Sequence, residues 1–582
     1  MLRRMSLLPF GKLAPYRPRK FLPTSLDFGD WSQIEPLFDR LENEAAQCAT
    51  AAALEKWLLD WGEFSAALDE EASCRYIAMT CHTDDESAKQ AYLHFVEAIE
   101  PKLKPRQFHL SKLFLEHPLR EQLPTERYLV FDRDTRVQVE LYRDENVPLE
   151  TEEAKLGQQY QELTGSLTVQ FRGEEKTLPQ MARFLEEPDR ALRQDAWETA
   201  ANRRLQEAPR FEEIFSQLAV LRERIAANAG FANYRDYAFR SKCRFDYTPE
   251  DCLDFHAAVE QEVLPIVREL QTARVQELGL DALRPWDSEV DPLHRPPLRP
   301  FQDVGELTSR AQAIFNRLEP ELGASFQTMQ ELRLLDLNNR RGKAPGGYQS
   351  TLNEARLPFI FMNAVGLQRD VETMLHEAGH AFHALATQNE DLYSYRHAPI
   401  EFCEVASMSM ELLGNEHLEQ FYSQQDAQRA RRVHLEGIVK FFPWMAIVDG
   451  FQHWIYTHPE HSSEARTTAW VELMERFGGL TDWRGYEQVR AHLWHRQLHI
   501  FLHPFYYVEY GIAQLGALQV WANSRRDKPG ALNAYRKALT LGGSRPLPEL
   551  FRAAGCSLAF TAKAIRPLMD LIRTDLARLT HC

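Results

Sequence analysis

Apolar residues recur three and four positions apart over most of this 582-residue chain, and this spacing restricts its fold more than any other feature. Such a period is typical of amphipathic helices whose apolar stripes face a common core. The sequence therefore predicts a mainly α protein, helical from Trp31 to about Asp132, from Leu178 to about Leu280, and mostly so after Leu367. The first clear stretch contains these apolar residues: Ile34, Leu37, Phe38, Leu41, Leu54, Trp57, Leu58 and Trp61.

Two short regions favour strands instead. Between Ser166 and Leu178, apolar and polar residues alternate up to the turn residues Arg172 and Gly173, which predicts one hairpin. Further along, the apolar run 358–362 follows a Gly-rich turn and predicts a second strand region. We therefore expect a few short strands in a helical protein.

The charge balance excludes one class of partner. The chain has 68 Lys and Arg residues against 84 Asp and Glu residues, a net charge of −16, whereas binding phosphate backbones needs a surplus of clustered basic residues. We expect no nucleic-acid partner. Charged residues also interrupt every long apolar stretch, so we expect no membrane partner.

The first twenty residues are basic, as in some targeting segments. However, they lack the long apolar stretch of a secretory signal, and three prolines interrupt any amphipathic transit helix. The eight cysteines are scattered without regular spacing, as ordinary thiols are. We expect a mature N-terminus and a cytoplasmic protein.

The segment His376-Glu377-Ala378-Gly379-His380 carries the clearest chemical signal. In a helix, positions 376 and 380 lie one turn apart on one face, so both imidazoles can reach one ion about 2.0–2.1 Å from each nitrogen. Glu377 is rotated by about 100° and would lie beside the ion as a general base for its water. Gly379 costs about 1 kcal/mol relative to Ala inside a helix, which suggests close packing beside an ion.

A catalytic zinc ion usually takes three protein ligands, so a third must come from elsewhere. Glu404 and Glu411 are seven residues apart on one helical face, so Glu404 could bind the ion while Glu411 holds a ligand histidine. Glu401 is the competing third ligand. His383 lies about 10.5 Å of helix rise from His376, so we expect it to be a packed or hydrogen-bonded neighbour of the site.

These segments resemble the oligoendopeptidase F branch of the thimet oligopeptidase (M3) family of zinc metallopeptidases. The resemblance rests on the motif 376–383 followed by Glu404-Val405-Ala406-Ser407, and on the stretches 346–348, 358–363 and 499–511. It covers roughly the C-terminal two-thirds of the chain. It implies a two-lobed helical molecule with a deep substrate channel, one zinc ion bound by His376, His380 and Glu404, Glu377 as the base, and short peptides as substrates.

The histidine- and tyrosine-rich stretch 499–510 could stabilise the oxyanion of a peptide under attack. Hydrogen-bond donors aimed at such an oxyanion are worth roughly 2.7–4 kcal/mol each. We assign this role to His499 and Tyr510, with Tyr506 or Tyr507 as further donors and His503 as the alternative to His499. The other interpretation is that these rings are core aromatics on one helix.

The strand at Phe359–Asn363 lies just before the metal-binding motif in the sequence. One of its edges could pair with an extended peptide through backbone hydrogen bonds, which would tolerate many substrate sequences. We therefore assign five residues to substrate binding: Gly346, Gly347, Tyr348, Phe359 and Phe361. The alternative is a strand enclosed by its own sheet.

Together these features predict a zinc-dependent endopeptidase that cleaves internal bonds of short oligopeptides. The expected division is an N-terminal helical domain with a hairpin, residues 1–190, and a catalytic domain, residues 191–582. The alternatives are a dipeptidyl carboxypeptidase of the same zinc class and a catalytically degenerate peptide-binding protein. Ligand types alone do not separate zinc from cobalt or manganese, and the sequence predicts no particular oligomeric state.

Overall fold

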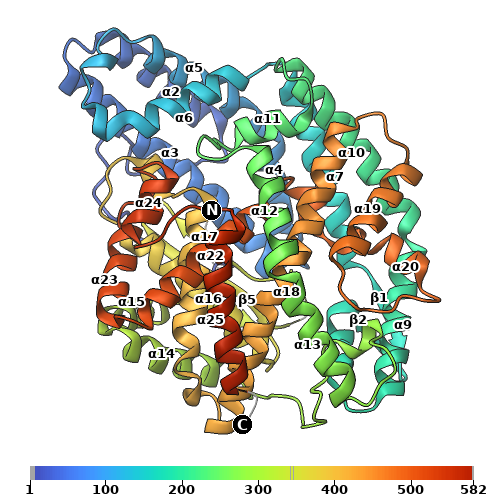
Figure 1. Cartoon of the computed structure of the whole chain (residues 1–582). Coiled ribbons are helices and arrows are strands. Elements are labelled where there is room, and N and C mark those ends of the chain that lie inside the picture. Colours follow the sequence, from blue (N-terminus) through green and yellow to red (C-terminus); the bar gives the residue numbers. More distant parts are fainter. Residues whose placement is uncertain (1–6, 341, 345, 580–582) are drawn as a thin grey trace. The chain divides into compact units, whose positions relative to one another are not determined.

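The computed structural model describes residues 7–340, 342–344 and 346–579, and Figure 1 shows that helices dominate it. The prediction of a mainly α chain with a few short strands is therefore confirmed. The described residues form five strands in two small sheets. No helix within these ranges is both long enough and apolar enough to cross a membrane.

The chain divides into two compact units, and each is assembled from three separate stretches. The first unit contains Met1–Val147, Arg299–Ala427 and Ala513–Leu558, and the second contains Pro148–Leu298, Gln428–Ile512 and Ala559–Cys582. Helices distant in sequence pack together within a unit, so neither unit is a continuous half of the chain. The division at residue 190 into a helical and a catalytic domain stays a prediction.

The first unit contains most of the N-terminal helices and those around the predicted metal site. Its helices are α2 (Trp31–Gln47), α3 (Ala51–Cys81), α4 (Glu86–His94), α5 (Glu100–Glu116), α6 (Thr125–Leu141), α14 (Val304–Leu318), α15 (Pro320–Glu331), α16 (Gln368–Ala386), α17 (Ile400–Asn415), α23 (Lys528–Leu539) and α24 (Leu547–Ala553). Apolar stripes of α2, α3, α5 and α6 meet in one buried core, as the helical spacing predicts.

The second unit is also mainly helical. Its helices are α8 (Leu178–Met181), α9 (Arg190–Gln206), α10 (Ala208–Asn228), α11 (Tyr234–Ser241), α12 (Pro249–Glu262), α13 (Leu264–Glu277), α19 (Ser463–Phe477), α20 (Glu487–Ala491), α21 (Leu498–Leu502) and α25 (Ala562–Leu579). The unit boundaries fall inside three further helices: α7 (Asn146–Gly165), α18 (Gln424–Thr457) and α22 (Tyr507–Ser524).

The predicted hairpin is present in the second unit. Strand β1 (Thr168–Phe171) pairs antiparallel with β2 (Glu174–Thr177). Arg172 and Gly173 form the two-residue turn, and both have positive φ, at 53° and 82°. Two such residues match the right-handed twist of the strands that they join, so the local sequence sets this turn.

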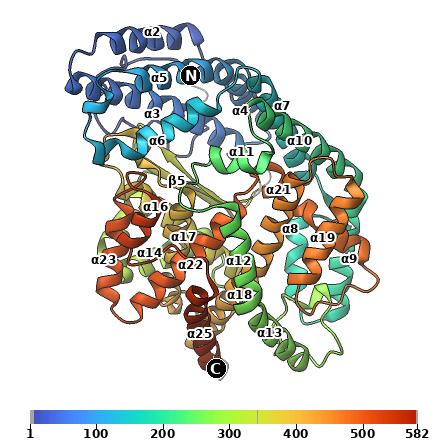
Figure 2. The same ribbon diagram turned by 45° about the horizontal axis from the view of Figure 1, so that its top comes forward.

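The sheet of the first unit contains three strands in the order β3 (Leu335–Asn338), β5 (Leu357–Ala364) and β4 (Tyr348–Leu352). Strand β5 runs parallel to β3 and antiparallel to β4, so it is the central strand. Helix α16 packs against β5 and runs beside α17 (Figures 1 and 2). This arrangement sets the predicted metal ligands between a small sheet and a second helix.

Candidate functional site

Helix α16 carries the motif histidines and begins directly after the sheet. The Asp370 carboxylate accepts the backbone N–H groups of Val365 and Leu367, at 2.8 and 2.9 Å, and so ties the end of β5 to the first turn of the helix. The apolar face of α16, which includes Met374 and Leu375, is fully buried. With that face fixed, the helical period turns His376 and His380 toward α17.

Three side chains from α16 and α17 converge on one point. The Nε2 atoms of His376 and His380 lie 3.2 Å apart, and Glu404 Oε2 lies 3.3 and 3.4 Å from them. Two ligands about 2.1 Å from a tetrahedral ion are separated by about 3.4 Å. The donor set of two imidazoles and one carboxylate therefore fits a zinc ion in both chemistry and spacing.

Hydrogen bonds orient two of the three side chains. The His376 Nδ1–H donates to Glu411 Oε1 at 2.7 Å, which leaves the Nε2 lone pair facing the other ligands. Ser407 Oγ lies 2.8 Å from Glu404 Oε2 and so holds that carboxylate. Ser407 was not among the predicted site residues, although its place three residues after Glu404, on the same helical face, was a usable signal.

The electrostatics of this group favour a cation. Burial opposes protonation of His376, but its hydrogen bonds to Glu404 and Glu411 outweigh burial and raise its pKa well above the ordinary value. Burial alone would raise the pKa of Glu404, but the two imidazoles hold it well below its usual range. The buried carboxylates therefore set up a field that attracts positive charge.

Gly379 is required by the contact between the two helices. A Cβ atom at this position would lie 2.6 Å from Ser407 Cα and 2.7 Å from the Ala406 carbonyl oxygen. From the sequence, this glycine was expected to permit close packing beside the ion. The structure instead places the backbone of α17 against it, and this contact brings Glu404 to the histidines.

Glu377 is buried next to the ligand group and beside the start of β4. Burial raises its pKa, although His376 and His380 act in the opposite direction. A Cβ atom on Gly347 would lie 3.8 Å from Glu377 Oε1 and 3.3 Å from a methyl group of Thr373. Gly347 therefore lies beside the Glu377 carboxylate, and the tighter neighbour of a side chain at this position would be Thr373.

Two other predicted residues lie outside the converging group. Glu401 is buried on the first turn of α17, but among the described residues the group that could hold an ion at α16 contains Glu404 instead. His383 is buried near the end of α16, with its ring beside Phe402. Burial, with smaller effects from His380 and His397, lowers the pKa of His383 to about 3, so it is neutral at ordinary pH.

The prediction that a peptide pairs with the strand at Phe359–Asn363 is wrong. Both edges of β5 are occupied, by β3 and β4. The side chains of Phe359 and Phe361 are 0% exposed, and Phe361 stacks on Tyr348 with ring centroids 4.7 Å apart. An apolar run of this kind is typical of a strand covered on both faces, and the pattern alone does not identify the edges of a sheet.

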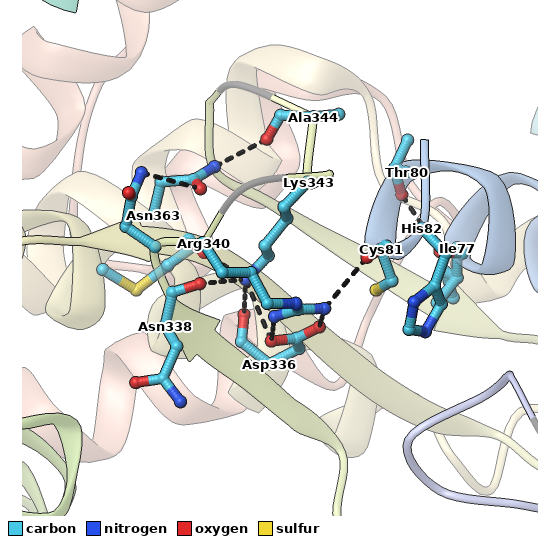
Figure 3. A network of polar contacts seen from close by, with 12 residues as sticks. Ile77, Thr80, Cys81, His82, Asp336, Asn338, Arg340, Lys343, Ala344 and Asn363 are labelled. Atoms are coloured by element: carbon cyan, nitrogen blue, oxygen red, sulfur yellow. Dashed lines mark hydrogen bonds and ion pairs between the residues drawn. The ribbon is translucent and has the colours of Figure 1, made fainter. Parts of the chain in front are cut away.

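A polar network joins Asp336 on β3 to Arg340 and Lys343 (Figure 3). Arg340 binds the Asp336 carboxylate at 2.6 and 2.7 Å, and Lys343 Nζ donates to Asp336 and to the Met362 carbonyl oxygen. Burial would raise the pKa of Asp336, but these donors lower it to about 2. Asn363 Nδ2 donates to the Gly346 carbonyl oxygen at 3.0 Å, so the turn beside Glu377 is held from β5.

The predicted oxyanion residues form one cluster in the second unit. The His499 ring contacts the rings of Tyr506, Tyr507 and Tyr510, with centroids 5.0–5.7 Å away, and His503 lies slightly farther, at 6.3 Å. Burial raises the pKa of Tyr507 to about 12, so its hydroxyl stays protonated. The cluster is not one helical stripe, because His499 lies on α21 and Tyr510 on α22.

The tautomer of His499 follows from its neighbours. Trp444 Nε1–H can only donate, and it lies 3.1 Å from Gln497 Oε1, so the Gln497 amide nitrogen donates to His499 Nδ1 at 2.8 Å. A neutral His499 therefore carries its proton on Nε2, which lies 3.5 Å from the Tyr510 hydroxyl. His499 thus has the N–H that a donor needs, and its catalytic role stays a prediction.

Comparisons with known proteins find similarity to peptidases. The model of peptidase family M3 matches residues 183–569, and a model of the M3 N-terminal domain matches residues 23–142. The solved structure of PZ peptidase A with inhibitor 2 is 29% identical to this chain, covers 96% of it and 99% of that protein, and has a TM-score of 0.91.

Two curated relatives are more distant in sequence. Oligopeptidase PepF of Bacillus subtilis (strain 168) is 24% identical over 53% of this chain and 46% of its own length. Group B oligopeptidase PepB of Streptococcus agalactiae serotype III (strain NEM316) is 22% identical over 62% of this chain and 59% of its own. The chain thus spans about half the length of the curated relatives that it matches.

Proposed function

Because the chain belongs to peptidase family M3, we propose that it is a zinc-dependent endopeptidase that hydrolyses internal bonds of short oligopeptides. One observation carries this proposal: His376, His380 and Glu404 bring three ligand atoms within 3.2–3.4 Å of one another, with a buried Glu377 beside them. The names of the oligopeptidase relatives support the choice of substrate class.

In this proposal His376, His380 and Glu404 hold the zinc ion. A zinc ion held by these residues would act as a Lewis acid toward the scissile carbonyl and would lower the pKa of a water molecule from 15.7 toward about 7. Glu377 accepts the proton of the attacking water and then gives it to the leaving nitrogen. Glu411 keeps His376 in the tautomer that presents Nε2, and we retain His499 and Tyr510 as predicted oxyanion donors.

Substrate recognition is assigned to β4 in place of β5. Ile360, opposite Gln349 in the register, donates its N–H to the Leu334 carbonyl on the β3 side. Pro358, opposite Thr351, has no N–H at all. Gln349–Ile360 and Thr351–Pro358 are therefore non-hydrogen-bonded pairs of the antiparallel ladder. The backbone N–H and C=O groups of Gln349 and Thr351 consequently point away from β5. They would hold an extended peptide with little regard to its side chains.

Two substitutions test the mechanism. We expect Glu377→Gln to keep wild-type zinc content but to lose nearly all turnover of a quenched fluorescent peptide, since the proton acceptor is gone. His380→Ala should lose the ion itself, measured by metal analysis of the purified protein. Glu372→Gln, on the same helix but outside the converging group, is the matched control and should retain activity.

Two outcomes would refute these roles. Full turnover by Glu377→Gln would exclude that residue as the base, and wild-type zinc content in His380→Ala would exclude that residue as a ligand.

Mapping the cleaved bonds in a mixed peptide library separates internal cleavage from the release of C-terminal dipeptides. Peptide binding without any hydrolysis by the zinc-loaded protein would indicate a degenerate site.

A further inference from the structure

Helices α12 and α18 lie side by side in the second unit (Figures 1 and 2). They carry a second group of metal-ligating side chains. Cys252 and His256 are four residues apart on α12, and Asp449 and His453 are four residues apart on α18. This spacing puts each pair on one helical face. All four residues are buried, with 1%, 4%, 0% and 4% of their surfaces exposed, in the same order.

Three of the four residues bring ligand atoms together. One ligand atom each from Cys252, Asp449 and His453 lies within 4.8 Å of the other two. His453 Nε2 is 3.2 Å from Asp449 Oδ2, close to the separation of about 3.4 Å between two ligands of a tetrahedral ion. His256 Nε2 approaches the same carboxylate oxygen at 2.9 Å.

The hydrogen bonding of this group is incomplete within the described part of the chain. Asp449 Oδ1 and His453 Nδ1 are buried there without a hydrogen-bond partner, and His453 Nε2, although 3.2 Å from Asp449 Oδ2, makes no hydrogen bond of good geometry. Buried polar atoms of this kind are normally paired, because leaving them unpaired costs their full desolvation energy. A network that served only to join the two helices would be expected to satisfy the His453 ring, and this one does not.

A thiol nucleophile is the other chemistry that a Cys, a His and an Asp could support. Such a site must admit a substrate, yet Cys252 is 1% exposed. The rings of Phe239 and Phe505 also pack on the His453 ring, with centroids 5.9 and 5.3 Å away. A single ion needs far less room than a substrate, so the enclosure favours metal binding over catalysis.

We propose that Cys252, Asp449 and His453 form a second metal site, which binds a zinc-class divalent transition ion between α12 and α18. A thiolate, an imidazole and a carboxylate are ligands that zinc accepts. The thiolate and the carboxylate together balance the two positive charges, so the buried site is neutral. The ion also gives a partner to lone pairs of Asp449 and His453 that otherwise lack one.

His256 is a positioning residue in this site. Its Nε2–H donates to Asp449 Oδ2 and so orients the carboxylate, much as Glu411 orients His376 in the first site. A Cβ atom on Gly450 would lie 3.7 Å from His256 Nδ1, so the α18 backbone runs close to that ring. The second site is structural in this proposal, because it joins two helices and has no open face.

Cobalt substitution of the full-length protein distinguishes the two sites. A thiolate bound to Co²⁺ gives a charge-transfer absorption band in the near ultraviolet, whereas the group at His376, His380 and Glu404 contains no thiolate. The protein is stripped of metal with a chelator, loaded with Co²⁺ and freed of excess ion by gel filtration. We expect two cobalt ions per chain together with the thiolate band.

Matched variants assign the band to its site. Cys252→Ser should lose the band and one ion per chain, while Cys556→Ser, at a buried cysteine outside both ligand groups, should keep both. His380→Ala should lose one ion but keep the band. His380→Ala therefore tests the two metal sites separately. Loss of the ion at the first site leaves the thiolate band of the second site unchanged.

The proposal is overturned if the wild-type protein binds a single cobalt ion and shows no thiolate band. It is equally overturned if Cys252→Ser keeps the band at wild-type intensity. The wild-type measurement does not depend on the folding of any variant, so it decides the question even if Cys252→Ser is unstable.

Discussion

At the scale of single residues, the group at α16 depends on side chains that touch the ligands as much as on the ligands themselves. His376 presents Nε2 because Glu411 accepts its Nδ1 proton, and Glu404 is held by the Ser407 hydroxyl. The sequence indicated Glu411 through its helical spacing, since seven residues return to the same face. Helical spacing alone left Glu401 as an alternative to Glu404, because both acidic residues lie within one turn of the same helix, and the choice of Glu404 rested on the family resemblance.

Removing the Glu411 carboxylate, which accepts the Nδ1 proton of His376, should weaken metal binding although no ligand is changed. We expect Glu411→Ala to reduce zinc affinity by roughly 10- to 100-fold, the usual effect of losing such a hydrogen bond. Glu411→Gln, whose amide oxygen can still accept the Nδ1 proton, should lose less. Competition with a chelator of known affinity measures both variants, and wild-type affinity in Glu411→Ala would contradict the role.

At the scale of elements, the approach of α16 to α17 decides whether the ligands meet. Gly379 permits that approach, since a Cβ at this position would collide with the backbone of α17. The sequence pointed to Gly379 as unusual in a helix interior but could not identify its neighbour, because helical periodicity says nothing about which helix packs on which.

Adding one methyl group at this contact should disturb both stability and metal binding. We expect Gly379→Ala to destabilise the protein by about 1–3 kcal/mol or more, because two backbones must separate, and to lower its zinc content. Gly437→Ala is the control: nothing lies within 4 Å of a Cβ at that position on α18, so it should be neutral or stabilising. Denaturant unfolding and metal analysis test both, and equal effects of the two substitutions would exclude the packing argument.

The edge of β4 offers a second test at this scale. We expect Gln349→Pro to remove an outward N–H and to lower kcat/KM roughly fivefold to tenfold, which corresponds to the loss of about one hydrogen bond. Because the lost N–H does not face β5, the melting temperature should change little. Ser350→Pro, which removes an N–H of the β4–β5 ladder, should instead lower the melting temperature, and the reverse pattern would overturn the assigned register.

At the scale of the whole molecule, hydrogen bonds to partly buried carboxyl groups join stretches that are far apart in the chain. Glu70 on α3 accepts the backbone N–H groups of Glu354 and Ala355, 284 and 285 residues away, both at 2.7 Å. Burial raises its pKa to about 7, despite these hydrogen bonds. The folded protein therefore keeps this proton over a range of pH in which the unfolded chain has already released it.

This difference sets a pH dependence of stability. A carboxyl whose pKa rises on folding stabilises the protein most below its unfolded value of about 4.5, and this contribution falls as the pH rises toward 7, by on the order of 3 kcal/mol. Glu70→Gln cannot ionise, so we expect its melting temperature relative to wild type to increase between pH 5 and pH 8. A constant difference across that range would show that Glu70 is ionised in the folded protein.

The sequence by itself determined what depends on neighbours a few residues away: the helical period, the hairpin turn at Arg172 and Gly173, and the shared face of His376 and His380. The tertiary structure alone decided that Glu404 meets the histidines, that β5 is the central strand, and that Cys252 faces His453. Local patterns specify which side of a helix or strand is apolar or reactive. The partner of that side depends on long-range packing, and many packings are compatible with the same local pattern.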